Sequence, residues 1–155
     1  GSRMLQLIAL FQQRGWRITF ASAAAASTHA VDLTTLGVTP AAIELNKSSF
    51  DTFVSELNPD IVLFDRFMTE EQFGWRVSEQ CPDALRILNT EDLHFLRKAR
   101  HELVKSGRAK DWGDVAIDRA DLITDSAMRE VASILRSDLS IMISEGLRER
   151  YMAAN

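Results

Sequence analysis

Cysteine is almost absent from this chain, which has a single one, Cys81, among its 155 residues. One cysteine cannot form an internal disulfide, and it cannot supply the thiolate cage of a structural zinc site. A chain of this length buries roughly 68–70% of its unfolded surface, so its core needs no covalent cross-link. Proteins without disulfides are typical of reducing compartments, and we expect a cytoplasmic location.

Long apolar runs and an excess of basic residues are also missing. No apolar stretch reaches the roughly 18 residues that a membrane-spanning helix requires. The first residues lack the order of charged and apolar regions that marks a signal peptide. The net charge of −4 argues against a dedicated nucleic-acid-binding domain, because such domains usually carry a basic excess.

Motifs that would identify a cofactor or a nucleophile are absent too. The sequence contains no glycine-rich dinucleotide fingerprint, no Walker loop, no nucleophile elbow and no zinc-ligand spacing. We therefore expect no cofactor and no metal. The composition, 46% hydrophobic and 26% charged, is that of an ordinary globular protein.

Apolar periodicity and turn residues predict that helices and strands alternate along the chain. This alternation predicts an α/β protein: a three-layer α/β/α Rossmann-like domain, 1–155, with a mostly parallel sheet and right-handed crossovers. Most doubly wound domains begin with a strand, so the helix at the start indicates that a first strand is missing here. Helices are expected at 2–14, 28–36, 50–57, 69–80, 94–109, 120–135 and 145–152, and strands at 17–22, 42–45, 61–64, 85–88 and 139–144.

Two apolar strands of this pattern end abruptly in polar residues. Asp65 and Arg66 follow the strand at 61–64, and the run from Asn89 to His94 follows the strand at 85–88. The chain should reverse direction at both places, at 65–66 and at 89–94. Because the carboxyl ends of parallel strands open onto the ligand crevice, we expect these two reversals to lie beside one shared hollow. The alternatives are structural: a strand-end ion pair at Asp65, and a helix cap by Thr90 or Asp92.

A dense basic stretch follows the second reversal. It could rest on an anionic membrane surface, which would make the protein membrane-peripheral, or it could be a solvated helix face that pairs with acidic residues. Its members are Arg97, Lys98, Arg100, His101, Lys105, Arg108 and Lys110.

Several segments, taken in their order, carry a family resemblance. They include Pro-Asp-Ile-Val-Leu-Phe-Asp-Arg-Phe at 59–67 and Asn-Thr-Glu-Asp-Leu-His-Phe-Leu-Arg at 89–97. The others cover 1–7, 14–22, 129–134 and 137–144. Together they resemble the N-terminal half of a group 1 glycosyltransferase with the GT-B fold. Such an enzyme has two Rossmann-like domains, of which the N-terminal one holds the hydroxyl acceptor and the C-terminal one the nucleotide-sugar donor.

The resemblance also implies substrate-binding residues. Gly1, Ser2 and Arg3 would match the loop after the family's first strand, near the acceptor and the donor phosphates. Asp65 and Arg66 would line the acceptor side. An alternative for Gly1-Ser2 is the remnant of a cleaved expression tag.

The catalytic residues implied by the resemblance are His94, Glu91 and Asp92, in the loop that reaches the transferred sugar. A histidine there contacts sugar hydroxyls or the acceptor, and the two acids would orient the imidazole or contact hydroxyls. Because the family's first strand and donor-binding domain are missing, this fragment alone is expected not to transfer sugar.

Two other functions stay open. The chain could be a non-catalytic α/β module for oligomerisation or partner binding, since a missing central strand would leave sheet edges exposed for self-association. It could also be a receiver-like regulatory domain with Asp65 as phospho-acceptor, although the acidic pair expected after a first strand is not present.

Overall fold

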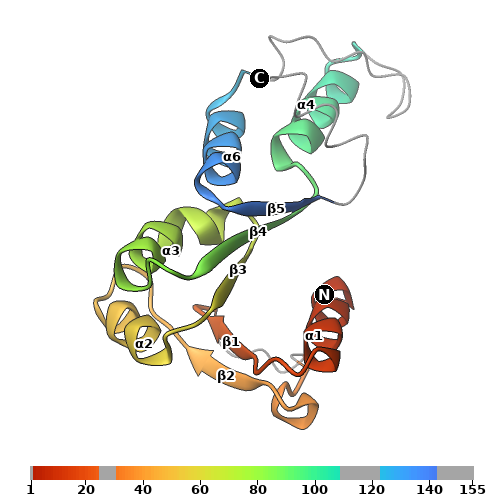
Figure 1. Ribbon diagram of the computed structural model, residues 1–155. Coiled ribbons are helices and arrows are strands. Elements are labelled where there is room, and N and C mark those ends of the chain that lie inside the picture. Colours follow the sequence, from red (N-terminus) through yellow and green to blue (C-terminus); the bar gives the residue numbers. More distant parts are fainter. Residues whose placement is uncertain (1, 25–30, 109–122, 143–155) are drawn as a thin grey trace. The chain divides into compact units, whose positions relative to one another are not determined.

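The computed structural model describes residues 2–24, 31–108 and 123–142. Contacts divide the chain into two compact units, Gly1–Thr52 and Phe53–Asn155 (Figure 1). Every strand pair among the described residues is parallel, which confirms the prediction of an α/β, Rossmann-like protein. The helix expected at 145–152 lies outside the described residues.

The first unit contains α1 (Ser2–Gln13), β1 (Thr19–Ser22), the 3₁₀ helix η1 (Thr34–Leu36) and β2 (Thr39–Ala42), and it leads into α2 (Ser49–Leu57). β1 and β2 are parallel, with Thr19 opposite Thr39. Gly15 follows α1 with a φ of 77°, which glycine adopts without steric cost, and this explains where the helix ends.

Two predictions for the first unit are wrong. In its described part, the helix expected at 28–36 is only the short η1, because the Asp32 carboxylate forms a local turn by accepting bonds from Thr34 N (3.0 Å) and Thr34 Oγ1 (2.6 Å). The strand expected at 42–45 ends at Ala42 instead of beginning there. It contains Pro40, which a strand at a sheet edge tolerates when the missing N–H faces away from the neighbour.

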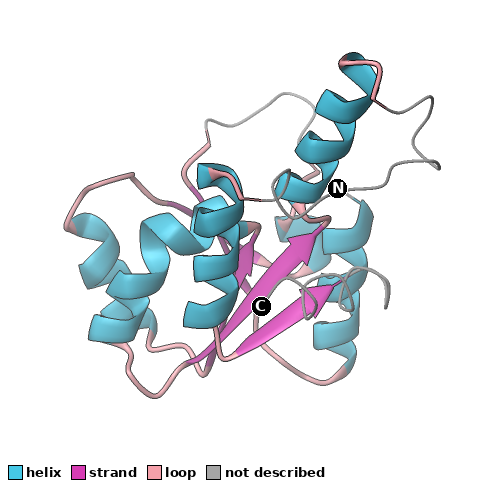
Figure 2. Cartoon of the chain, turned by 90° about the horizontal axis from the view of Figure 1, so that it is seen from above, coloured by secondary structure: helices cyan, strands magenta, loops and turns pink. Residues whose placement is uncertain are grey.

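The second unit contains a three-stranded parallel sheet in the order β3-β4-β5. Figure 2 draws the strands as magenta arrows and the helices in cyan. Asp65 at the end of β3 lies opposite Asn89 of β4, and Asn89 lies opposite Ile141 of β5. The elements are β3 (Ile61–Asp65), α3 (Phe67–Gln80), β4 (Leu85–Glu91), α4 (His94–Lys105), α6 (Asp125–Arg136) and β5 (Leu139–Met142).

Several predicted boundaries in this unit change. β4 continues past Leu88 to Glu91, so Asn89 and Thr90 belong to the strand and not to a loop. α3 begins at Phe67, two residues before the helix start expected at 69. The Thr69 hydroxyl donates to the carbonyl oxygen of Asp65 over 2.8 Å, inside the first turn of the helix. α4 ends at Lys105, where Gly107 takes a φ of 72°.

The core of the second unit is formed by apolar residues of its strands and of its helices. Leu88 in the central strand is completely buried, and each such large apolar side chain contributes about 1.5–3 kcal/mol through burial. α4 buries apolar residues at helical spacing, three or four apart, and leaves the basic residues Arg97, Lys98 and Lys105 exposed. Its buried apolar residues are Phe95, Leu96, Ala99 and Leu103.

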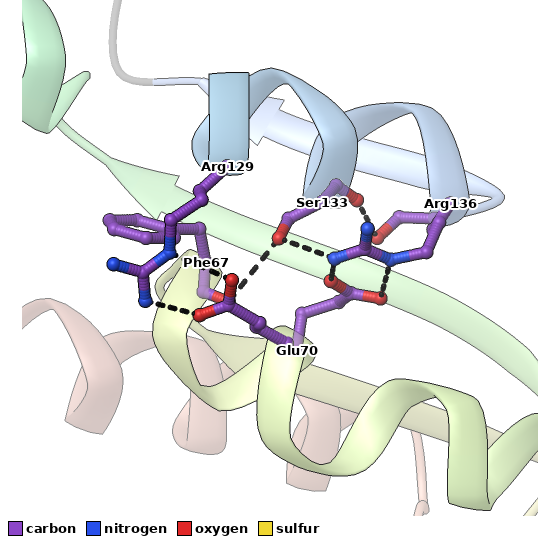
Figure 3. A network of polar contacts seen from close by, with 7 residues as sticks. Phe67, Glu70, Arg129, Ser133 and Arg136 are labelled. Carbon is purple, nitrogen blue, oxygen red and sulfur yellow. Dashed lines mark hydrogen bonds and ion pairs between the residues drawn. The ribbon is translucent and has the colours of Figure 1, made fainter. Parts of the chain in front are cut away.

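Two ion pairs join α3 to α6 (Figure 3). Arg136 donates to both carboxylate oxygens of Glu70, over 3.1 and 2.6 Å, and Arg129 pairs in the same bidentate way with Glu71. Ser133 stands between the arginines, where it accepts a bond from Arg136 (3.1 Å) and donates to the carbonyl of Phe67 (3.4 Å). α6 is therefore fastened to the first turn of α3, directly after the strand end at Asp65.

Candidate functional site

The ends of β3 and β4 meet through side chains as well as through the sheet. Nδ2 of Asn89 donates to Oδ1 of Asp65 over 3.1 Å. The backbone N–H of Arg66 donates to the carbonyl of Asn89 over 2.9 Å, one step beyond the last residue of β3. The two chain reversals that the sequence indicated are thus direct neighbours at the carboxyl edge of the sheet.

Both reversals use an unusual backbone conformation. Arg66 has φ 72° and ψ 157°, and Glu91 has φ 56°. Residues with a Cβ rarely adopt positive φ, and each such residue costs of the order of 1–3 kcal/mol. The same two residues form an ion pair, with Nη2 of Arg66 3.5 Å from Oε2 of Glu91. Strained backbone of this kind is concentrated at functional sites, and here it occurs on both strand ends.

His94 and Asp92 lie at the start of α4, just after this edge. Nε2 of His94 is 3.6 Å from Oδ1 of Asp92, whose Oδ2 is 2.8 Å from Nη1 of Arg97. The His94 side chain is only 15% exposed. Its ring packs edge-on against Phe67 with centroids 5.5 Å apart. Since Phe67 follows Arg66 directly, the imidazole lies near both reversals.

The first turn of α4 is capped by a residue that sequence reasoning missed. The Glu130 carboxylate, on α6, accepts bonds from the backbone N–H groups of His94 (3.1 Å) and Phe95 (3.0 Å). Glu130 is 1% exposed. Burial raises the pKa of the Glu130 carboxyl, and the two N–H bonds oppose this only in part.

The caps that the sequence suggested for α4 are wrong. Leu93 occupies the position before the helix, where no side chain caps it. The Thr90 hydroxyl donates to the carbonyl of Ile141 on β5 over 2.9 Å, and Asp92 pairs with Arg97 instead. The sequence contained one signal for Glu130. It lies on the same face of α6 as Ala127 and Ile134, which are buried, and a buried acid is almost always paired.

The predicted site residues belong to two different units of the chain. Asp65, Arg66, Glu91, Asp92 and His94 all belong to the second unit. Ser2 and Arg3 begin α1 in the first unit, and Gly1 lies outside the described residues. Their participation in the site stays a prediction.

The groups at this edge include hydrogen-bond donors and acceptors, which are able to bind hydroxyl groups. The carboxylate of Asp65 and the half-exposed Arg66 offer an acceptor and a donor. Asn89 is completely buried, and among the described residues its Oδ1 has no hydrogen-bond donor. Among those residues, no group of three or more His, Cys, Asp or Glu side chains is arranged to hold a metal ion.

The exposed side of α4 is basic, as expected. Lys98 and Lys105 are exposed, Arg97 is engaged with Asp92, and Lys110 lies outside the described residues. Within the described parts of the chain, no helix is both long and apolar enough to cross a membrane. Contact of this helix with a membrane surface stays a prediction.

Comparisons with models of protein families, with curated proteins and with solved structures find no match for this chain. The resemblance to GT-B glycosyltransferases therefore rests on the sequence segments alone. The geometry of the strand ends is the independent ground on which a function can be proposed.

Proposed function

We propose that this chain is the acceptor-side domain of a glycosyltransferase that moves a sugar from a nucleotide-sugar donor to a hydroxyl acceptor. The observation that carries the proposal is the contact between Asp65 and Asn89. This contact joins the ends of β3 and β4 and brings the polar residues of both reversals to the carboxyl edge of a parallel sheet. Open α/β sheets bind ligands at that edge.

Each residue has a role in this proposal. Asp65 accepts a hydrogen bond from an acceptor hydroxyl, while Arg66, balanced by Glu91, contacts the same molecule as a donor. His94, oriented by Asp92, contacts the reacting sugar or acceptor hydroxyl. Positioning and electrostatic support would be the main contribution of these residues to the transfer.

Acceptor binding is the property to test in this chain, because the donor belongs to the other domain of such enzymes. Saturation-transfer NMR with a panel of monosaccharides, disaccharides and sugar phosphates should detect binders, and amide shifts should map them to 65–66 and 89–94. Asp65→Asn should weaken binding about tenfold, the effect of losing one hydrogen bond to a charged group.

Asp138→Asn is the matched control, because Asp138 is also an acid paired with an arginine, Arg86, but precedes β5 at the opposite end of the sheet. It should leave sugar binding unchanged. If no sugar in the panel shifts the amides at 65–66 and 89–94, the proposal fails. In a complete enzyme, release of nucleoside diphosphate by a His94→Ala variant at the parent rate would remove His94 from the mechanism.

A second candidate is an interaction module that assembles through sheet edges. Within the described residues, β5 pairs with β4 only, and Leu139 in it is 51% exposed. A strand with one open edge can pair through that edge with another copy. Sedimentation would show a stable homo-oligomer, and Leu139→Lys should dissociate it, whereas the acceptor-domain proposal requires no such assembly.

A further inference from the structure

The start of α4 depends on a distant residue. The two N–H groups that Glu130 binds belong to His94 and Phe95, which precede it by 36 and 35 residues in the chain. The first N–H groups of a helix have no partner within the helix, and they usually bind a side chain at the preceding position. Leu93 stands there, and its side chain cannot accept a hydrogen bond. The backbone of His94 is therefore held by α6.

The side chain of His94 also depends on α6, through the ring of Phe67. The imidazole packs edge-on against Phe67 at 5.5 Å, and the guanidinium of Arg129 lies 5.7 Å from the centroid of that phenyl ring. Arg129 precedes Glu130 in α6, and it is itself fixed by its bidentate pair with Glu71 (Figure 3). Adjacent residues of α6 thus hold the main chain of His94 and the ring against which its side chain packs.

We propose that Glu130 is a positioning residue for the His94 imidazole. This role rests on the proposed function, in which His94 faces the acceptor. Glu130 is buried and contacts the backbone of His94, so it acts through His94 and not on the ligand. The positive end of the α4 dipole favours a carboxylate at this place, which opposes part of the cost of its burial.

The test compares three variants by NMR and by sugar binding. Glu130→Ala removes both acceptors, and Glu130→Gln keeps one acceptor oxygen for one of the two N–H groups. Glu70→Gln is the control: Glu70 is also a buried acid, 3% exposed, but its partner is Arg136 and not α4. All three variants should lose stability through loosened helix packing, so stability alone does not distinguish them.

The decisive readouts are the amide signals of His94 and Phe95 and the ring-proton signals of His94, which the Phe67 ring current displaces. Glu130→Ala should move all of them, Glu130→Gln should restore part of the change, and Glu70→Gln should leave them in place. Sugar binding should weaken about tenfold in Glu130→Ala, because a displaced His94 would lose about one hydrogen bond to the ligand.

The two proposals can fail separately. If the wild-type protein binds no sugar, the acceptor-domain proposal fails, and the His94 signals still decide whether Glu130 positions the imidazole. If Glu130→Ala does not fold, Glu130→Gln provides the same comparison. His94 ring signals that are unchanged in the folded Glu130 variants, or that move equally in Glu70→Gln, would overturn the positioning role.

Discussion

Gly74 and Glu70 face each other within α3: a Cβ atom placed on Gly74 would overlap Oε1 of Glu70. Any side chain at position 74 would require the Glu70 carboxylate to move. The missing side chain of Gly74 therefore allows the Glu70 carboxylate to lie along α3 and meet Arg136 of α6 (Figure 3). A glycine inside a helix is normally unfavourable, and here it makes room for the ion pair between two helices.

Replacing Gly74 by alanine should lower stability, although alanine is the better helix former. The methyl group would push the Glu70 carboxylate, 3% exposed, away from Arg136. Separating a buried pair costs about 3–5 kcal/mol, but Arg136 is half-exposed and helix propensity returns about 1 kcal/mol, so we expect a net loss of about 1–2 kcal/mol in urea unfolding.

The same substitution in a Glu70→Ala background should have the opposite sign. With no carboxylate to displace, Gly74→Ala should stabilise the protein by up to about 1 kcal/mol. Equal effects of Gly74→Ala in both backgrounds would show that the glycine does not act through Glu70.

Asp138 should make the stability of the second unit depend on acid pH. The backbone N–H of Arg86 donates to Asp138 over 2.8 Å, and the Arg86 guanidinium pairs with the same carboxylate. These bonds hold the pKa of Asp138 below its ordinary value of 3.8. A carboxyl group of this kind stabilises the fold above its unfolded pKa, and the contribution is lost as the pH falls from that value through the folded pKa.

Asp138→Asn should therefore lower the free energy of unfolding at pH 7 by about 1 kcal/mol, and less at pH 3. Urea unfolding at several pH values would show a flatter pH dependence in the variant between about pH 5 and pH 3. Parallel curves for the two proteins in this interval would contradict the expectation.

The sequence was sufficient for the parts of the fold that depend on local pattern. The apolar run at 61–64 is a strand, and the amphipathic pattern at 2–14 is a helix, because periodicity and turn residues decide such elements. The neighbourhood of Asp65 and Asn89 was also predictable, because parallel strands end at the same edge of a sheet.

The parts that the sequence did not predict depend on contacts between distant residues. Glu130 caps α4 across the fold, and local cap rules see only Thr90 and Asp92. Asn89 and Thr90 look like a polar loop, yet they continue β4 because β3 and β5 flank them. The bounds of β2 were not predicted because the strand contains Pro40. A proline indicates the end of a strand unless the strand is known to lie at a sheet edge.

Glu130 should give the protein a pH dependence of the opposite sign to that of Asp138. Burial raises the pKa of the Glu130 carboxyl above 4.5, so the folded state binds its proton more tightly than the unfolded state. The free energy of unfolding should therefore fall as the pH rises from about 4.5 through the folded pKa. Glu130→Gln does not titrate, so the stability advantage of the wild type over this variant should shrink across the same interval.

Chemical denaturation of both proteins from about pH 4 to pH 8 would measure this difference. An advantage that grows with pH would mean that the α4 N–H groups outweigh burial and that the pKa of Glu130 is lowered. The amide shifts of His94 and Phe95 would report the same titration in the wild-type protein.

Arg66 should show a conflict between stability and ligand binding. Its φ of 72° and ψ of 157° are unfavourable for arginine and accessible to glycine. Arg66→Gly should therefore raise the free energy of unfolding relative to Arg66→Ala by about 1–2 kcal/mol, because both variants lose the pair with Glu91 and only glycine relieves the strain. Both variants should lose sugar binding to the same extent, since neither has a guanidinium. If Arg66→Gly gained no stability over Arg66→Ala, the backbone at the end of β3 would not be strained. If the two variants kept full sugar binding, the side chain of Arg66 would have no part in the site.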